Sequence, residues 1–354
     1  AILEEEREQP DRLSNLPDSL IHHIFSFIDT KYAVQTCVLS TRFKNLWTSL
    51  PNLNFDCYRF RKMRMFSKFL SKVLSRRDSS TTVSTLNFSR SCGTVEPWVM
   101  KRIINYAIQH NVQRLNMDVS SCRQLPSLPL IFNSKSLTNL KLVFCDTDFF
   151  QNLPNSLNLP ALTTLHLEGV SFSNELFSNC LNLKNLILID FSIEGLDVFS
   201  IFSPQLVNLT ISSHLMRKCK FVLDAPNLSS FQLHGFPNLE LSADNLPSLQ
   251  TVEVNILHPR ANENNEMIVL AVINVFQQLR NAKLVTLYAD VIEILSVVPS
   301  LVEHQPSPFA NLKSLKLRVR SATSTIPDHV MTYLLSSSPS AAAVVELKRT
   351  TPSS

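Results

Sequence analysis

The side chains that most often carry out catalysis are scattered in this chain of 354 residues. The glycines at positions 93, 169, 195 and 235 are isolated, so no glycine-rich loop could cradle a phosphate. The sequence contains no H-E-x-x-H zinc motif and no G-x-S-x-G nucleophile turn. His22 and His23 are adjacent, and neighbouring residues on a helix cannot converge on one metal ion. The sequence therefore predicts a protein that is not an enzyme and that uses no cofactor or metal.

Cysteine usage and charge narrow the class further. The seven cysteines form no C-x-x-C pair, which is typical of reduced thiols in a protein of the nucleus or cytoplasm. No apolar run approaches the roughly 18 residues of a membrane span. Residues 57–77 contain eight Lys and Arg and no acid, leaving 25 basic against 29 acidic residues elsewhere. This balance predicts neither general nucleic-acid binding nor membrane association.

Large apolar side chains recur at a helical spacing between residues 13 and 56. One stripe, on a helix that begins near Pro17, repeats every four residues and consists of Leu16, Leu20, Ile24 and Ile28. Asp29 or Thr30 is expected to cap a second short helix, and Ser40 a third. Three helices in about forty residues bury their own apolar faces poorly, so the surplus surface needs a partner.

This segment resembles an F-box, through Leu16-Pro17 near its start and the run VLSTRFKNLW near its end. The aromatic pair that is usual in that run is Phe43 and Trp47 here. The resemblance implies binding to a Skp-type adaptor, which connects F-box proteins to a cullin–RING ubiquitin ligase. The residues expected to contact the adaptor are Leu16, Pro17, Leu20, Ile24, Phe25, Ile28, Val38, Leu39 and Trp47. The alternative is a helical cap that only seals the end of the next domain.

Residues 57–82 are predicted to form a basic linker helix that caps the following domain. Apolar side chains, among them Phe66, Leu70 and Val73, recur at a helical period, and the outward positions are basic. The charged side of this helix is expected to be a solvated face. The alternatives are a nuclear-import patch and a contact with an acidic partner.

From residue 83 to residue 320 the pattern L-x-x-L-x-L, or a close apolar variant, returns about ten times. The units begin at residues 83, 112, 137, 162, 183, 206, 228, 249, 284 and 312. Most steps have the length of a leucine-rich repeat, in which stacked units bury the inward fourth and sixth residues of short strands. The predicted fold class is therefore α/β: a three-helix F-box, then a curved, horseshoe-shaped solenoid with parallel strands on its concave face.

This register predicts both a core and a binding face. The expected core residues are Leu140, Leu142, Leu165, Leu167, Leu186, Leu188, Leu209 and Leu233. The third, fifth and seventh residues of each unit should face outward on the concave side, where the residues expected to bind a target protein are His166, Glu168, Ile187, Ile189, Thr210 and His234. Ile187 and Ile189 form an apolar spot, which is either an anchor for the target or a patch covered by a neighbouring loop.

The repeats resemble those of plant F-box proteins with leucine-rich repeats. Several units start after a proline, and in four units the ninth position holds Cys145, Val170, Phe191 and Phe236 instead of asparagine. The asparagine ladder found at that position in other leucine-rich repeats is therefore expected to be absent. Residues 321–354 resemble the opening of an FBD domain, here as a degenerate start followed by a tail.

The resemblance implies the substrate-recognition subunit of a Skp–cullin–F-box ubiquitin ligase, a non-catalytic role. The F-box would bind the adaptor and the repeats an unidentified target protein. Two alternatives stay open: a scaffold that binds partners without ubiquitination, and a receptor gated by a small ligand on the concave face. Residues 1–12 are acidic and are predicted to form a disordered tail.

Overall fold

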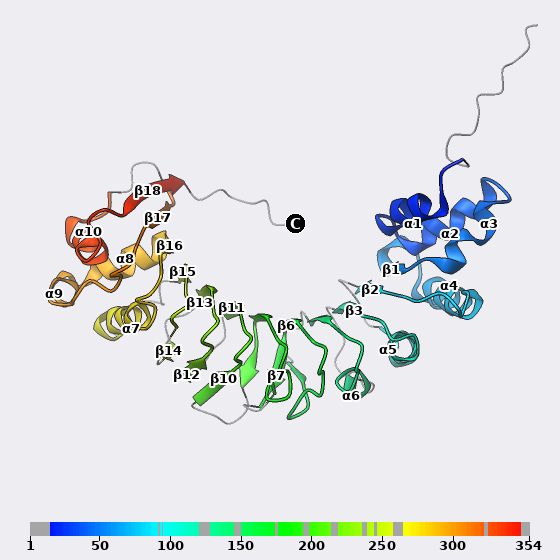
Figure 1. Cartoon of the computed structure of the whole chain (residues 1–354), viewed down its shortest axis with the longest axis horizontal. Coiled ribbons are helices and arrows are strands. Elements are labelled where there is room, and N and C mark those ends of the chain that lie inside the picture. The colour runs from blue at the N-terminus through cyan, green and yellow to red at the C-terminus, as the bar shows by residue number, and fades with distance from the viewer. Residues whose placement is uncertain are drawn as a thin grey trace, which may run out of the picture. The chain divides into compact units, whose positions relative to one another are not determined.

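The structure is a computed structural model that describes residues 15–90, 93, 95–119, 128–144, 150–173, 176–193, 198–213, 219–235, 239–243, 246–257, 265–321 and 325–347. The predicted acidic tail, residues 1–12, lies outside this part of the chain. The chain divides into two compact units, residues 1–139 and residues 140–354 (Figure 1). Within the described ranges, no helix combines the length and the apolar character needed to cross a membrane.

Unit 1 begins with short helical segments, one of which has a side-chain cap. The segments are α1 (Asp18–Ser26), α2 (Thr30–Gln35) and α3 (Phe43–Leu46), with 3-10 turns at Thr36–Val38 and Trp47–Ser49. α1 starts directly after Pro17, whose missing N–H would have no partner in the first turn. The Asp29 carboxylate accepts a hydrogen bond from the backbone N–H of Lys31 at 2.7 Å and caps α2. The predicted cap at Asp29 is therefore confirmed.

Three parallel strands with helical connections complete unit 1. The strands β1 (Asn52–Asp56), β2 (Thr85–Arg90) and β3 (Arg114–Val119) pair in that order, and the connecting helices are η3 (Cys57–Arg59), α4 (Met63–Arg76) and α5 (Pro97–Gln109). Another short helix, α6 (Leu128–Ile131), follows β3. The ring of Phe66 on α4 is fully buried between Phe55 and Phe88, with centroids 6.4 and 5.8 Å away. The apolar side of the predicted linker helix thus packs on the sheet.

One parallel sheet forms the main part of unit 2. Its strands, in spatial order, are β4 (Asn139–Val143), β6 (Thr164–Glu168), β8 (Asn185–Ile189), β11 (Asn208–Ser213), β13 (Ser230–Gly235), β15 (Thr251–Ile256), β16 (Leu284–Tyr288), β17 (Ser314–Val319) and β18 (Ala342–Leu347). All eight leucines that were predicted to form the core are buried, and Leu165 is completely inaccessible to solvent. The repeat register is therefore confirmed for these units.

Among the described residues, the connections of unit 2 contain two small parallel sheets and four helices. The first small sheet contains β5 (Gln151–Asn152), β7 (Val170–Phe172) and β9 (Ser192–Ile193), and the second contains β10 (Val198–Phe202), β12 (Cys219–Asp224) and β14 (Leu239–Ser242). The helices are α7 (Asn265–Gln278), α8 (Ala289–Val297), α9 (Pro299–Glu303) and α10 (Asp328–Leu335), and Figure 1 shows them after β14, where the small strands end.

A column of aromatic rings fills the interior beside the small sheets. Phe172 stacks on Phe191 with centroids 5.5 Å apart, and Phe199 stacks on Phe221 at 5.3 Å. All four rings are at most 1% exposed. Phe191 occupies the ninth position of its unit, so a buried ring fills the place where other leucine-rich repeats carry asparagine.

Several strands end in a residue with a left-handed backbone, always at the eighth position of the unit. Gly169 has φ +68°, Asp190 has φ +40° and Gly235 has φ +131°. A Cβ at Gly169 would lie 1.6 Å from the carbonyl oxygen of Phe144, so only glycine fits there. Two of the isolated glycines, Gly169 and Gly235, thus lie at strand ends.

The register predicted for the unit at residue 284 was wrong by two residues. Leu284 pairs with Thr251, the third residue of the preceding unit, so the unit begins at residue 282. Val285 and Leu287 are its buried inward residues, while Leu284 is 46% exposed. Because side chains alternate along a strand, a shift of two keeps the same face inward, and the apolar pattern fits both registers.

The sheet of unit 2 continues beyond residue 320. After α10, the strand β18 pairs in parallel with β17, with Lys316 opposite Val344 and Arg318 opposite Glu346. The segment expected to resemble the start of an FBD domain therefore adds the strand β18 to the repeat sheet, and the helix α10 connects this strand to β17.

Candidate binding surfaces

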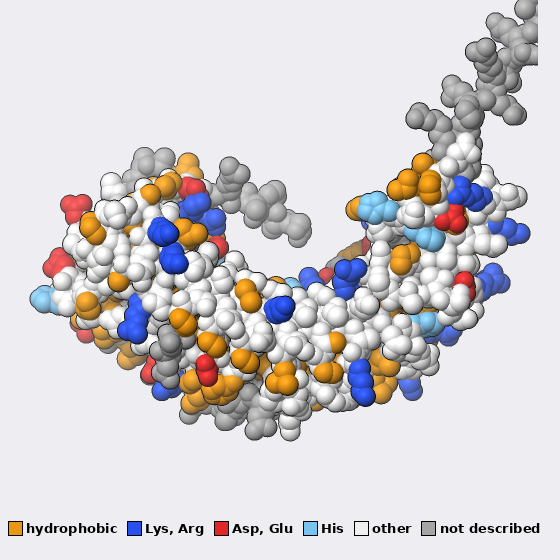
Figure 2. All heavy atoms as spheres, viewed as in Figure 1, with side chains coloured by type: hydrophobic (Ala, Val, Ile, Leu, Met, Phe, Trp, Pro, Cys, Tyr) orange, Lys and Arg blue, Asp and Glu red, His pale blue; other side chains and the backbone are white. Residues whose placement is uncertain are grey.

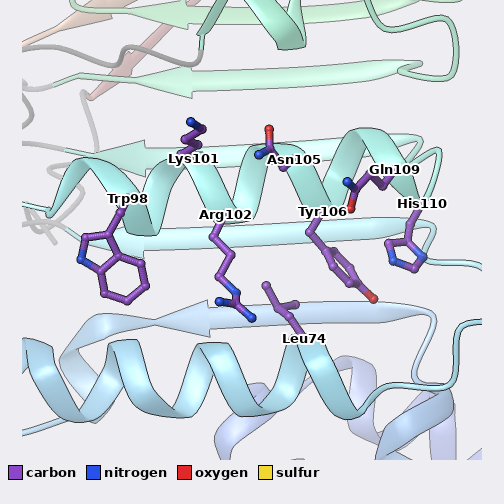
Figure 3. A pocket seen from close by; sticks show the side chains of 8 residues that line it. All are labelled: Leu74, Trp98, Lys101, Arg102, Asn105, Tyr106, Gln109 and His110. Atoms are coloured by element: carbon purple, nitrogen blue, oxygen red, sulfur yellow. The ribbon is translucent and has the colours of Figure 1, made fainter.

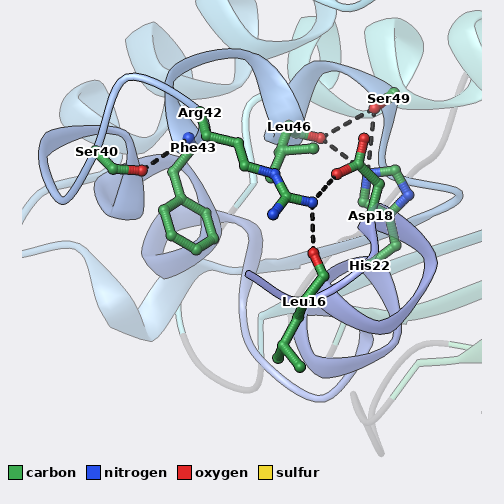
Figure 4. A network of polar contacts seen from close by, with 8 residues as sticks. All are labelled: Leu16, Asp18, His22, Ser40, Arg42, Phe43, Leu46 and Ser49. Carbon is green, nitrogen blue, oxygen red and sulfur yellow. Dashed lines mark hydrogen bonds and ion pairs between the residues drawn. The ribbon is translucent and has the colours of Figure 1, made fainter. Parts of the chain in front are cut away.

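A polar clamp fixes the start of α1 in the F-box segment (Figure 4). The guanidinium of Arg42 donates hydrogen bonds to the carbonyl oxygen of Leu16 and to the carboxylate of Asp18. The Asp18–Arg42 pair is a salt bridge between partly exposed side chains. Arg42 therefore connects the turn before α3 to the first turn of α1, where the predicted adaptor contacts begin.

His22 connects α1 to the last helical turn of the same segment. Its Nε2 donates to the carbonyl oxygen of Leu46 at 3.2 Å and lies 3.2 Å from the hydroxyl of Ser49 (Figure 4). His23 is exposed, and its ring contacts the edge of Phe27 with centroids 4.9 Å apart. The two adjacent histidines therefore have different structural roles.

Asp29 ties α2 to the sheet. Its second carboxylate oxygen accepts from the backbone N–H of Asp56, the last residue of β1, at 2.9 Å. Burial raises the pKa of this carboxyl above its ordinary value, an effect that the hydrogen bonds from Lys31 and Asp56 oppose.

An apolar surface stands exposed on this rigid frame. Of the predicted adaptor contacts, Leu20 is 49% exposed, Ile24 44%, Val38 83% and Leu39 66%. Pro17 is also exposed, while Leu16, Ile28 and Trp47 are half-buried. Figure 2 shows apolar side chains gathered over α1. Monomeric proteins seldom expose several large apolar side chains together, so this surface is a candidate site for binding another protein.

Phe25 does not belong to this surface. Its side chain is only 6% exposed and contacts Phe43, with ring centroids 6.2 Å apart. The helical period explains the correction, because the residue lies on the inner side of α1 next to buried Ile21. Phe25 therefore supports the surface from beneath.

Two exposed aromatic residues belong to the same segment and were missed in the sequence. Phe27 is 76% exposed and Tyr32 is 42% exposed. Phe27 follows Ile24 by three residues and Leu20 by seven, so the helical spacing that selected those two also predicts Phe27. No comparable sequence signal marks Tyr32, which lies on α2.

The second candidate surface is the outward face of the unit 2 sheet. His166 lies beside Ile187, and Glu168 beside Ile189, on the paired strands β6 and β8. Thr210 adjoins Ile187 from the other side, on β11. All of these side chains are half-buried. The structure therefore places five of the six predicted target-binding residues on three adjacent strands.

His234 is one strand further along the same face, on β13. It pairs across the ladder with Ser212, and its ring lies 6.2 Å from the ring of Tyr288. The imidazole Nε2 of His166 lies 3.6 Å from the carboxylate of Glu168. Polar pairs such as Thr210 and Gln232, whose oxygens are 3.2 Å apart, connect neighbouring strands.

A charged and aromatic cluster on β15 to β18 was not predicted. The Tyr288 hydroxyl donates to the carboxylate of Glu253 and accepts from the guanidinium of Arg318. Arg318 also lies over the Tyr288 ring, 5.2 Å from its centroid, and Lys316 forms an ion pair of 3.1 Å with Glu346. The predicted register placed Tyr288 opposite Glu253 and two residues away from Arg318, whereas in the structure Tyr288 pairs directly with Arg318 and Glu253 pairs with Thr286.

Asparagine ladders also occur, although not at the ninth position. In unit 1 the amide of Asn116 donates to Asn87, and the amide of Asn87 donates to Asn54, each at 2.6 Å. In unit 2 Asn208 donates to Asn185 at 2.6 Å. These side chains lie on the outward face of the strands, where each ladder satisfies the amides of neighbouring units.

The helical segment and the strand-per-repeat sheet define an F-box followed by leucine-rich repeats, and comparison with known proteins agrees. The family model of the F-box domain matches residues 13–55. The model of the leucine-rich repeats of the FBD-associated F-box protein At5g56370 matches residues 100–254. The chain thus carries an F-box and leucine-rich repeats similar to those of plant FBD-associated F-box proteins.

Similar curated proteins come from Arabidopsis thaliana. F-box/FBD/LRR-repeat protein At5g22660 is 30% identical over 271 residues, which cover 71% of this chain and 58% of that protein. F-box/LRR-repeat protein At3g58980 is 32% identical over 260 residues, covering 70% of this chain and 43% of that protein. The chain thus spans about half the length of these relatives.

Proposed function

We propose that this chain is the substrate-recognition subunit of a Skp–cullin–F-box ubiquitin ligase. The observation that carries the proposal is the exposed apolar surface of the F-box, above all Val38 and Leu39, held on a frame that Arg42 and Asp29 fix. Burying such side chains at the centre of an interface commonly contributes about 2 kcal/mol or more for each anchor. The partner on this surface is a Skp-type adaptor and, through it, a cullin–RING ligase.

The repeats would bind the target protein through the outward strand face of unit 2. The chain contributes no chemistry of its own in this mechanism. It holds the target near the ubiquitin carrier, so that transfer to a target lysine occurs at a high effective concentration. The scattered thiols of the sequence suit a place of action in the nucleus or cytoplasm.

The test uses a double variant of the F-box surface and a matched control. Leu20→Asp with Val38→Asp places two charges on the proposed adaptor site, and both side chains are already exposed, so the fold should survive. Val198→Asp with Phe202→Asp makes the same change at exposed apolar residues on β10. Titration with purified Skp-type adaptor should show loss of binding for the first variant only. Equal adaptor affinity of both variants and the wild type would contradict the proposal.

Ubiquitination distinguishes the ligase subunit from a non-degradative scaffold. The wild-type chain, reconstituted with adaptor and cullin–RING ligase, should increase ubiquitin transfer to proteins that it captures, and the F-box variant should not. Capture of the same proteins without transfer would support the scaffold.

A further inference from the structure

The outer face of α4 and α5 in unit 1 carries a row of basic side chains. On α4, exposed Arg64, Lys68, Lys72 and Arg76 repeat every four residues, and exposed Lys101 and Arg102 lie on α5. No ion pair joins any of these six to a carboxylate within the described part of the chain. The two acidic residues that flank the helices, Asp78 and Glu96, bond Ser80 and Trp98 respectively. This face therefore presents positive charge that is not neutralised locally.

A hollow of about 470 Å³ opens on this face (Figure 3). Trp98, Arg102 and Tyr106 point from α5 toward α4, where Leu74 points back to them, and Lys101 and Asn105 project on the other side of the helix (Figure 3). Arg102 donates to the carbonyl oxygen of Ser71 on α4 at 3.4 Å. Because residues three apart are neighbours on a helix, Lys68 lies next to Ser71 at this edge.

The floor of the hollow is firmly held. Tyr106 is buried, its hydroxyl accepts from the guanidinium of Arg77 at 2.9 Å, and the ring of His110 stacks on it at 4.1 Å. Arg77 in turn donates to the carbonyl oxygen of Leu50 at 2.6 Å. The hollow is thus a preformed feature of unit 1.

We propose that this hollow and the basic row beside it bind an acidic peptide segment of another protein. Successive basic residues on α4 rise by about 6 Å, close to the roughly 6.6 Å between alternate side chains of an extended peptide. The ring of Trp98 is 46% exposed and its N–H is used by Glu96, so the ring face is available to an apolar side chain of the ligand. Lys101 and Arg102 would pair with carboxylates of the peptide.

The side-chain amides of the hollow favour a peptide over a nucleic acid. Asn105 and Gln109 line it, and each amide both donates and accepts, as a peptide group does. A phosphodiester only accepts. Binding of single strands commonly uses several exposed rings for base stacking, and Trp98 is the one exposed aromatic residue among those that line the hollow. The site shares no residue with the F-box surface or the strand face, so the inference stands whether or not the chain binds an adaptor.

The experiment measures fluorescence anisotropy of a labelled peptide in which glutamate and serine alternate around one central leucine. The whole chain should bind this peptide, with an affinity that falls as salt is raised, and should not bind the same peptide with glutamine in place of glutamate. Lys101→Glu with Arg102→Glu should weaken binding about tenfold or more, because two exposed attractions become repulsions. Arg280→Glu with Lys313→Glu, at exposed positions in unit 2, is the matched control and should leave the affinity unchanged.

A second variant tests the indole independently of charge. Trp98→Ala should weaken the leucine-containing peptide several-fold and leave a peptide with serine at the centre unaffected. Equal binding of the wild type and the Lys101, Arg102 variant would overturn the proposal. So would a single-stranded oligonucleotide of equal charge that binds as tightly as the peptide, since this would show a general affinity for polyanions.

Discussion

The two candidate surfaces of this protein are built in opposite ways. On the F-box segment, large apolar side chains stand out from short helices, with Val38 83% and Phe27 76% exposed. On the strand face of unit 2, the most apolar pair, Ile187 and Ile189, is only half-buried and is flanked on both sides by polar side chains of the neighbouring strands. One surface has much apolar area to remove from water, and the other has many directional polar groups.

This difference indicates how each surface would select a partner. Removing apolar area from water supplies binding free energy with little directional preference. Polar groups add little net free energy but penalise a partner that leaves them unpaired. The F-box surface therefore suits one constant partner, and the strand face suits discrimination among targets.

The largest expected effect distinguishes a residue that supports the F-box fold, Phe25, from one that we expect to contact the adaptor, Phe27. Phe25→Ala should cost unit 1 about 3–5 kcal/mol of unfolding free energy, because it empties a buried ring position against Phe43. Phe27→Ala removes a ring that is 76% exposed and should leave stability nearly unchanged. It should instead weaken adaptor binding by roughly 2 kcal/mol, about thirtyfold.

Chemical denaturation and adaptor titration of both variants check this pair. If Phe27→Ala destabilises the chain as much as Phe25→Ala does, the exposed ring is structural and the contrast between the two surfaces weakens.

The next effect tests whether the two surfaces are energetically independent. Leu165→Ala removes a completely buried side chain from the core below the strand face and should cost about 2–5 kcal/mol. In a stacked array the loss stays with neighbouring units, so adaptor affinity should not change. Hydrogen exchange should show faster opening of β6 and β8 and unchanged protection of α1. A parallel loss of protection in α1 would show that the chain unfolds as one cooperative block.

The repeat core was predictable because a period of two along each strand and a step of 20 to 29 residues both leave a clear mark on leucine positions. Leu165 and its seven counterparts are buried as expected. The same evidence failed at residue 284, since a shift of two residues keeps the apolar face inward. Only pairing with a neighbouring strand fixes such a register, and the sequence of a single chain does not show that pairing.

The sites were less predictable than the fold, for a related reason. Helical spacing found Leu20 and Ile24 but could not show that Phe25 turns inward, because both faces of α1 are apolar. The cluster of Glu253, Tyr288 and Arg318 depends on three strands that are far apart in sequence, and Glu253 and Arg318 are separated by 65 positions. Polar side chains leave no periodic mark, so contacts of this kind require the structure.

Charged substitutions on the strand face should change stability less but should strongly weaken target binding. Ile187→Asp with Ile189→Asp should keep the fold, since both side chains already reach solvent. Proximity labelling with this variant should recover targets at a level at least about tenfold below wild type, with adaptor binding intact. Thr286→Asp, on β16 of the same face, is a control for added charge. An unchanged target list would place recognition elsewhere on the repeats.

The smallest expected effect concerns the polar network of Glu253, Tyr288 and Arg318 on the strand face. The F-box surface described above relies on apolar contacts instead. Tyr288→Phe removes the hydroxyl that donates to Glu253 and accepts from Arg318, and it keeps the ring. The loss should be about 0.5–1.5 kcal/mol of unfolding free energy. Tyr32→Phe, on the F-box, is the matched control and should cost less, because the Tyr32 hydroxyl makes no hydrogen bond among the described residues.

The pH dependence of this difference has a defined sign. Burial, followed by the neighbouring Glu253, raises the pKa of Tyr288 above its ordinary value of 10.0. A group whose pKa is raised on folding stabilises the folded state fully below its unfolded pKa, and that contribution is lost as the pH rises through the folded pKa. The stability gap between the wild type and Tyr288→Phe should therefore be constant up to about pH 9 and shrink above pH 10. A gap that widens with rising pH would mean that the ionised hydroxyl is the stabilising form, paired with Arg318, and the strand face would then be held by charge in place of a neutral hydrogen bond.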